Sequence, residues 1–287
     1  MPDVAKQQIR ALRRGGGRAG RAERRAAADT VRSPAIITRK IPTYELLGEE
    51  ALNRIEVHAD WILAEVGIEF RGDQEALTLF RRAGADVTGE RVRFEPGLAA
   101  SLCATAPGSF RMEARDPANA IVLGGDHVVL MPSYGPPFVS DLDGGRRYAT
   151  LEDFRNIVKL TYMSPFLNHS GGTVCEPVDV PVNKRHLDMV YAHLRYSTKP
   201  FMGAVTAPER AADSIERART VFGSQNMEKA CVIQGNINVN SPLFYDHIMS
   251  GSLKAYSRSN QSCVISPFIL GGAMGTVTQP ALLAQSH

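Results

Sequence analysis

Apolar residues recur every three or four positions along residues 46–63, and Gly67 follows them. This spacing predicts an amphipathic helix that ends at a glycine. A second helix is predicted to begin after Asp73, a favourable N-cap residue, and to end at Gly84. Residues 96–105 predict a third helix, residues 86–94 a short hairpin around Gly89, and residues 109–115 and 120–123 two strands. Residues 35–125 are therefore expected to form an α+β N-terminal segment.

From His127 onward, short apolar runs alternate with helical patterns. The predicted strands are 128–131, 166–169, 200–205, 230–240 and 262–270. The predicted helices are 151–162, 183–196, 208–222, 244–258 and one that begins at Pro280. Such alternation with short connections is typical of βαβ units and a parallel sheet.

About five βαβ units fit into the last 160 residues, whereas a TIM barrel has eight. None begins with the GxGxxG turn of a dinucleotide-binding fold. The expected class is therefore α/β. Residues 126–287 are predicted to form a partial (β/α) barrel of the TIM type that is incomplete at its C-terminus.

Charge is unevenly distributed along the chain. Residues 1–33 contain nine basic and three acidic residues, a net +6, so the remainder carries −3 because the whole chain carries +3. Residues 1–34 are expected to be a disordered basic tail, and a nucleic-acid arm, a membrane-surface arm or a transit peptide are the alternatives. The mildly acidic remainder does not indicate nucleic-acid binding.

Compartment and cofactor expectations follow from the apolar runs and the cysteines. No run is long enough to span a membrane, and no secretory signal is evident. The four cysteines are scattered singly, which predicts reduced thiols and a cytoplasmic location. Cys175, Cys231 and Cys263 lie near three different predicted strands, but CxxC and HxxxH spacings are missing, so no metal site is predicted.

Candidate site residues were sought where parallel strands end, because function lies at that edge of an α/β barrel. His169 is the one histidine at a predicted strand end, and is a candidate either for acid–base catalysis or for a structural hydrogen bond. The alternation of Gln234, Asn236, Asn238 and Asn240 predicts an amide row on one face, either lining a ligand or forming a buried polar ladder. The remaining strand-end candidates are Tyr134, Phe138, Asn168 and Phe268.

Several segments resemble the trimethylamine methyltransferase family. They are FLNHSGGTVCEPVDVP (166–181), KPFMGAVTAPERAADSIERARTVFG (199–223), IQGNINVNSPLFYD (233–246) and SPFILGGAMGTVTQPALLAQ (266–285). Residues 51–70 and 131–154 also resemble the family's first helix and first barrel segment. The resemblance covers about residues 35–285 and rests on many ordered segments.

This resemblance implies a TIM barrel that moves a methyl group from trimethylamine, or from a quaternary amine such as glycine betaine, to cobalamin. The cobalamin is supplied by a partner corrinoid protein, no tightly bound cofactor is expected, and the full-length form is expected to be a homo-oligomer. In the family's founding members pyrrolysine is the catalytic residue, at a position beyond His287. The catalytic residue is thus unassigned, and the chain is expected to be a C-terminally truncated member.

A quaternary ammonium must be recognised through charge and aromatic faces. Within the resemblance, Tyr134, Phe138, Tyr148 and Phe268 are the candidate cage residues, and Asn168, Gln234, Asn236 and Asn238 are candidates for holding a carboxylate. Two alternatives remain: a TIM-barrel lyase or aldolase that uses a Schiff-base lysine, and a non-enzymatic remnant. The lysine candidates are Lys159, Lys184, Lys199 and Lys254.

Overall fold

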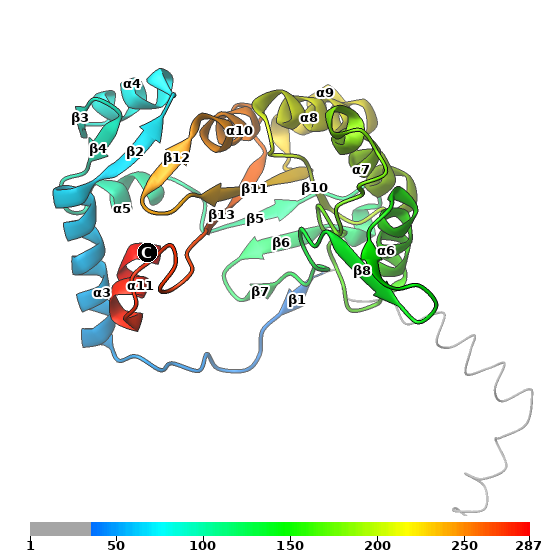
Figure 1. The fold of residues 1–287 in the computed structure, drawn as a ribbon, viewed down its shortest axis with the longest axis horizontal. Coiled ribbons are helices and arrows are strands. Elements are labelled where there is room, and N and C mark those ends of the chain that lie inside the picture. The colour runs from blue at the N-terminus through cyan, green and yellow to red at the C-terminus, as the bar shows by residue number, and fades with distance from the viewer. Residues whose placement is uncertain (1–35) are drawn as a thin grey trace, which may run out of the picture. The chain divides into compact units, whose positions relative to one another are not determined.

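The computed structural model describes residues 36–287, and the predicted basic tail lies outside them (Figure 1). The first half of the described chain contains β1 (Ile37–Thr38), α3 (Glu49–Trp61), the π-helical turn η1 (Ile62–Val66), β2 (Ile68–Arg71), α4 (Gln74–Arg82), β3 (Asp86–Thr88), β4 (Arg91–Arg93), α5 (Leu98–Cys103), β5 (Ser109–Met112), the 3-10 turn η2 (Pro117–Asn119) and β6 (Ile121–Gly124). The predicted helix boundaries are close: the Asp73 carboxylate caps α4 by accepting from the Ala76 amide, and Gly67 follows η1 with a φ of 72°.

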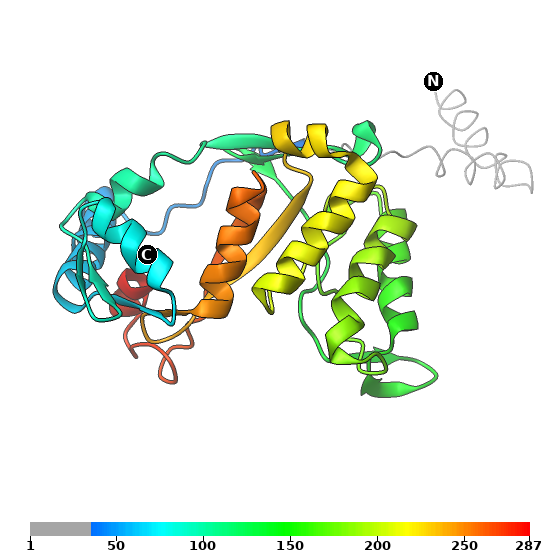
Figure 2. The same cartoon turned by 90° about the horizontal axis from the view of Figure 1, so that it is seen from above.

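In the second half strands and helices largely follow one another as the apolar pattern predicts, but a hairpin at residues 138–148 was not predicted and the predicted strand 166–169 is not a regular strand. It contains β7 (His127–Val128), β8 (Phe138–Asp141), β9 (Gly145–Tyr148), α6 (Leu151–Met163), α7 (Val182–Tyr196), β10 (Phe201–Met202), α8 (Pro208–Phe222), α9 (Ser224–Lys229), β11 (Ile233–Val239), β12 (Phe244–Asp246), α10 (His247–Arg258), β13 (Ser262–Pro267) and α11 (Gln279–Ser286). Helices α6, α7, α8 and α10 lie side by side in that order (Figure 2).

Strands β10, β11 and β13 form a parallel sheet in that order. Two extended segments continue it beyond β10. The Ser170 amide donates to the Pro200 carbonyl at 2.7 Å, and the amides of Asn168 and His169 donate to the Leu130 carbonyl at 3.1 and 3.3 Å. The five predicted strands therefore neighbour one another in chain order, but the described strands do not close into a barrel. The structure confirms the mixed α/β class and leaves the barrel type a prediction.

The predicted helix 244–258 is wrong at its start. Phe244–Asp246 form β12, which pairs in parallel with β2 in the sheet β12-β2-β4-β3. The Asp246 carboxylate accepts from the amides of Ile248 and Met249, at 3.0 and 2.8 Å, and so sets the first turn of α10 at His247.

The core between the parallel sheet and helices α7, α8 and α10 is built around Tyr256, which is fully buried. A Cβ atom at Gly203 would lie 2.4 Å from the Tyr256 hydroxyl, and one at Gly235 would lie 2.7 Å from its ring. Gly203, directly after β10, and Gly235, on β11, thus leave the space that the tyrosine occupies.

Helix α10 is tied to α4 by a largely buried ion pair. Lys254 Nζ lies 2.6 Å from Asp73 Oδ1, and Ser250 Oγ donates to Asp73 Oδ2 at 2.6 Å. Burial favours a raised pKa for Asp73, but hydrogen bonds from Lys254, Ser250 and the Ala76 amide hold that pKa below its ordinary value. The N-terminal α+β segment and helix α10 are therefore joined by an ion pair and a hydrogen bond.

Replacing Lys254 with methionine is expected to lower the free energy of unfolding by about 2 kcal/mol, because Asp73 then stays buried without its cation. Part of the loss should disappear as the pH falls through the folded pKa of Asp73, since a carboxyl with a lowered pKa contributes stability only above that pKa. Urea unfolding measures both effects. Lys159→Met, which removes a more exposed lysine on α6, should change stability by less than about 0.5 kcal/mol. Equal losses in the two variants would contradict the assignment.

Candidate functional site

Two loops meet where the first two strand segments end. The Gly135 amide donates to the Thr173 carbonyl at 2.7 Å, and the Glu176 amide donates to the Pro136 carbonyl at 2.9 Å. Ser133 Oγ adds a third link, to the Val174 carbonyl at 3.3 Å. Residues 133–136 are thereby held against residues 173–176, and Tyr134 takes a defined position between the two loops.

Tyr134 reaches from its loop to β11. Its ring packs over Gly172, where a Cβ atom would lie 2.7 Å from ring atom Cε2, so the glycine is needed for this approach. Burial and the charge of Glu176 raise the pKa of the Tyr134 phenol, while its interactions with the side chains of Thr173 and Asn236 lower it. The side chain is still 41% exposed. Tyr134 is therefore a partly exposed residue whose phenol lies near the side chains of Thr173 and Asn236.

Three of the four predicted amides share the face of β11 that Tyr134 reaches. In register, Gln234, Asn236 and Asn238 lie beside Ser262, Val264 and Ser266 of β13. Ser266 Oγ donates to Asn236 Oδ1 at 2.9 Å. Gln234 is 1% exposed, and its buried Oε1 atom finds no hydrogen-bond partner among residues 36–287. Asn240 leaves the row because its Nδ2 donates to Asp246 at 2.7 Å. The amide row thus has a buried oxygen without a hydrogen-bond partner at Gln234, while Asn236 and Asn238 are only half-buried.

His169 is fully buried, and its Nδ1 atom accepts from the Gly171 amide at 2.9 Å, so the ring proton lies on Nε2. This Nε2 atom has no hydrogen-bond partner within the described part of the chain. Burial, assisted by the nearby His193, lowers the pKa of His169 to about 3. A sealed, neutral imidazole is poorly placed for acid–base catalysis, and the geometry favours its structural alternative.

His193 on α7 is the second buried imidazole of this region. Its Nδ1 atom lies 2.8 Å from Ser170 Oγ and its Nε2 atom lies 2.7 Å from the Gly172 carbonyl. Burial lowers its pKa to about 4, against a smaller opposing effect of the hydrogen bond to Gly172. His193 is therefore neutral near pH 7 and holds α7 against the strand end beneath Tyr134.

Asn168 serves the strands rather than an open site. Its Oδ1 atom accepts from the Leu130 amide at 2.7 Å, and its Nδ2 atom donates to the Val128 carbonyl at 3.3 Å. The side chain is 3% exposed, and its hydrogen bonds to backbone groups link two neighbouring segments.

Two of the four predicted cage rings pair with each other. Phe138 and Tyr148 pair across the β8–β9 hairpin, with ring centroids 4.6 Å apart, and the Arg146 guanidinium lies 3.9 Å from the centroid of Phe138. Phe268 follows β13 and is 53% exposed. Of the candidate rings, Tyr134 is the one whose phenol lies near an amide of β11, that of Asn236, and the aromatic cage stays a prediction.

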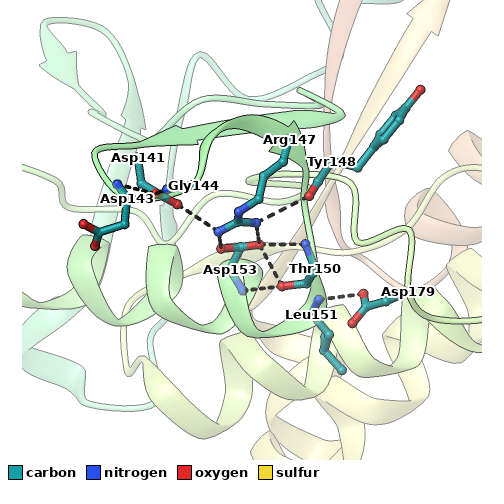
Figure 3. A network of polar contacts seen from close by, with 9 residues as sticks. All are labelled: Asp141, Asp143, Gly144, Arg147, Tyr148, Thr150, Leu151, Asp153 and Asp179. Carbon is teal, nitrogen blue, oxygen red and sulfur yellow. Dashed lines mark hydrogen bonds and ion pairs between the residues drawn. The ribbon is translucent and has the colours of Figure 1, made fainter.

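Sequence reasoning missed Arg147. Its guanidinium binds both carboxylate oxygens of Asp153, at 2.5 and 2.8 Å, and Asp141 Oδ2 at 3.0 Å (Figure 3). Asp153 also completes a capping box with Thr150 at the start of α6, and hydrogen bonds from Arg147 and Thr150 hold its pKa well below the usual range. The T-x-x-D pattern at 150–153 predicts the helix cap, but it does not predict that Arg147 binds Asp153.

Lysine and metal chemistry have little support in residues 36–287. Lys199 is buried near the start of β10, where its Nζ atom donates to the carbonyls of Thr161, Ser164 and Leu167. Burial lowers its pKa to about 8, but it lies at the opposite strand end from Tyr134. Across the same residues no group of three His, Cys, Asp or Glu side chains could hold a metal ion, and no helix is long and apolar enough to cross a membrane.

Known proteins are similar in sequence to most of this chain. It is 41% identical over 85% of its length to a glycine betaine methyltransferase of Desulfitobacterium hafniense, covering 50% of that protein. It is 27% identical over 73% of its length to an L-carnitine:corrinoid methyltransferase of Eubacterium limosum, covering 39% of it. A proline betaine:corrinoid methyltransferase of the same organism is 29% identical over half of the chain. The chain thus spans half or less of the length of these relatives.

The profile of the trimethylamine methyltransferase (MTTB) family matches residues 13–287, which include all the strand-end residues described above. This chain therefore belongs to the trimethylamine methyltransferase family.

Proposed function

We propose that this chain takes part in methyl transfer from a quaternary amine, glycine betaine or a close analogue, to a corrinoid carried by a partner protein. The observation that carries the proposal is the 41% identity to a glycine betaine methyltransferase over residues that include Tyr134 and the β11 amide row. The same proposal treats the five neighbouring segments as part of a TIM-type barrel that is preceded by the α+β segment 35–125.

The chemistry needs little from ionisable side chains. A quaternary nitrogen has no lone pair to protonate, and displacement at its methyl carbon releases a neutral tertiary amine. The corrinoid supplies the nucleophile. The protein then contributes by orienting the methyl group and excluding water, which is consistent with the two buried neutral histidines near the strand ends.

The site offers different surfaces to the two ends of a betaine. The partly exposed Tyr134 suits the trimethylammonium group, and the nearby Glu176 carboxylate is already paired with Arg185. The side-chain N–H groups of Asn236 and Asn238 suit the carboxylate. Asn168 and Phe138 are already engaged with the Val128–Leu130 segment and with Arg146, respectively, so we assign them no substrate contact.

Asn236→Ala is expected to weaken glycine betaine binding about tenfold, because one hydrogen bond to a charged carboxylate is lost. Titration calorimetry with the purified chain measures the dissociation constant. Asn156→Ala, on the exposed side of α6, is the matched control and should bind like wild type. Glycine betaine that binds both variants equally would refute the amide row as its carboxylate site, and no binding to wild type would refute the proposed substrate class.

A further inference from the structure

The β8–β9 hairpin is braced on both sides although it pairs with no other strand in the described residues. On one side Arg147 connects Asp141 of the hairpin to Asp153 of α6 (Figure 3). On the other side Arg146 stacks on Phe138, which packs against Tyr148. Isolated two-stranded hairpins are marginally stable in water. This hairpin is held as a preformed projection.

The turn of the hairpin is also fixed. Asp141 Oδ1 accepts from the amides of Asp143 and Gly144, at 3.1 and 2.6 Å, and Gly145 adopts a φ of 61°. Between these residues Leu142 points entirely into solvent, while Tyr148 at the base is 58% exposed. A rigid turn that presents a leucine does not serve the core of this chain.

The hairpin lies at the strand-end side of the sheet. It is inserted between the loop that carries Tyr134 and the first turn of α6, and the Ala149 amide donates to the Pro137 carbonyl at 3.1 Å. The loop around residues 178–179 contacts the base of the hairpin. There the Val178 amide donates to the Ala149 carbonyl, and the Asp179 carboxylate accepts from the Leu151 amide. In Figure 2 the hairpin projects beyond the N-terminal end of α6.

We propose that the β8–β9 hairpin, with Leu142 at its tip, is a docking element for the protein that brings the corrinoid to the strand-end site. This inference rests on the proposed function. The hairpin directly follows the loop that carries Tyr134, so a methyl acceptor that reaches this loop comes close to the hairpin. A preformed element loses little conformational freedom on binding, and an apolar side chain at its tip can enter a pocket of the partner.

Binding of the chain to the cobalamin-loaded corrinoid protein of the same organism, measured by biolayer interferometry, tests the proposal. Leu142→Asp should weaken the dissociation constant about tenfold or more, and Leu142→Ala by a smaller factor. Met163→Asp is the matched control, since Met163 is a well-exposed apolar residue at the other end of α6, and it should bind like wild type. Arg147→Met should also weaken binding by releasing the hairpin, and Arg147→Lys should recover part of the loss.

Three results would overturn the docking role: no binding by wild type, an unchanged constant in Leu142→Asp, or equal losses in Leu142→Asp and Met163→Asp. Light scattering checks the competing occupant, a second copy of the chain; a dimer that Leu142→Asp converts to a monomer would assign the hairpin to self-association instead. Calorimetry with glycine betaine separates the two proposals. Betaine binding without hairpin-dependent docking refutes only the docking role, and docking without betaine binding refutes only the proposed substrate.

Discussion

Lowering the pH from about 8 to about 5 is expected to reduce the free energy of unfolding by about 4 kcal/mol. His169 and His193 have pKa values of about 3 and about 4 in the folded chain, below the ordinary 6.5, because both rings are buried. The unfolded chain therefore binds protons below pH 6.5 that the folded chain does not. The stability that these neutral rings contribute is present above about pH 6.5 and is lost as the pH falls, by about 2 kcal/mol for each ring at pH 5.

Urea unfolding at a series of pH values measures this loss. His193→Gln should be less stable at pH 8, but should lose only about 2 kcal/mol on acidification, since one titrating ring remains. Val158→Ala, a buried change that removes no imidazole, should lower stability and keep the full pH dependence. A stability that stays constant between pH 8 and pH 5 would contradict the sealed, neutral state of the two histidines.

Tyr256→Ala is expected to lower the free energy of unfolding by about 3–5 kcal/mol, because it empties the space that Gly203 and Gly235 leave for the ring. Tyr256→Phe should cost only about 1 kcal/mol, the hydrogen bond to the Ala204 carbonyl. Chemical denaturation measures both losses, provided that the dependence of the unfolding free energy on denaturant concentration is the same in the variants and in wild type.

A double-mutant cycle tests the proposed fit. Gly235→Ala should cost about 1–3 kcal/mol beside Tyr256, since the new methyl group meets the ring, and clearly less in the Tyr256→Ala background. Additive effects would show that the glycine and the tyrosine do not share the space described above.

Sequence pattern predicted the helices best where the determinants are local. Helix α8 has the predicted bounds, Pro208–Phe222, because a proline at its start and a glycine after its end act within one turn. Strand β12 was missed because Phe244–Asp246 fit the helical period of α10, and only pairing with β2, distant in sequence, makes them extended.

The candidate site was predictable as a region and not as a set of contacts. Strand-end placement and alternation found Tyr134 and the β11 amides. They could not show that Asn168 is committed to backbone groups of Val128 and Leu130, or that Arg146 covers Phe138. Such pairings depend on loops that are distant in sequence, and the residue types alone are equally suited to ligand contact.

Following the methyl group itself tests the proposed function most directly. The chain is incubated with glycine betaine carrying 13C in its N-methyl groups and with cob(I)alamin, and carbon NMR follows the products. We expect methylcobalamin and dimethylglycine to appear together in equal amounts, faster than without protein, and more slowly with Asn236→Ala. Labelled glycine betaine that remains unchanged in the presence of the cooperatively folded chain would contradict the proposal.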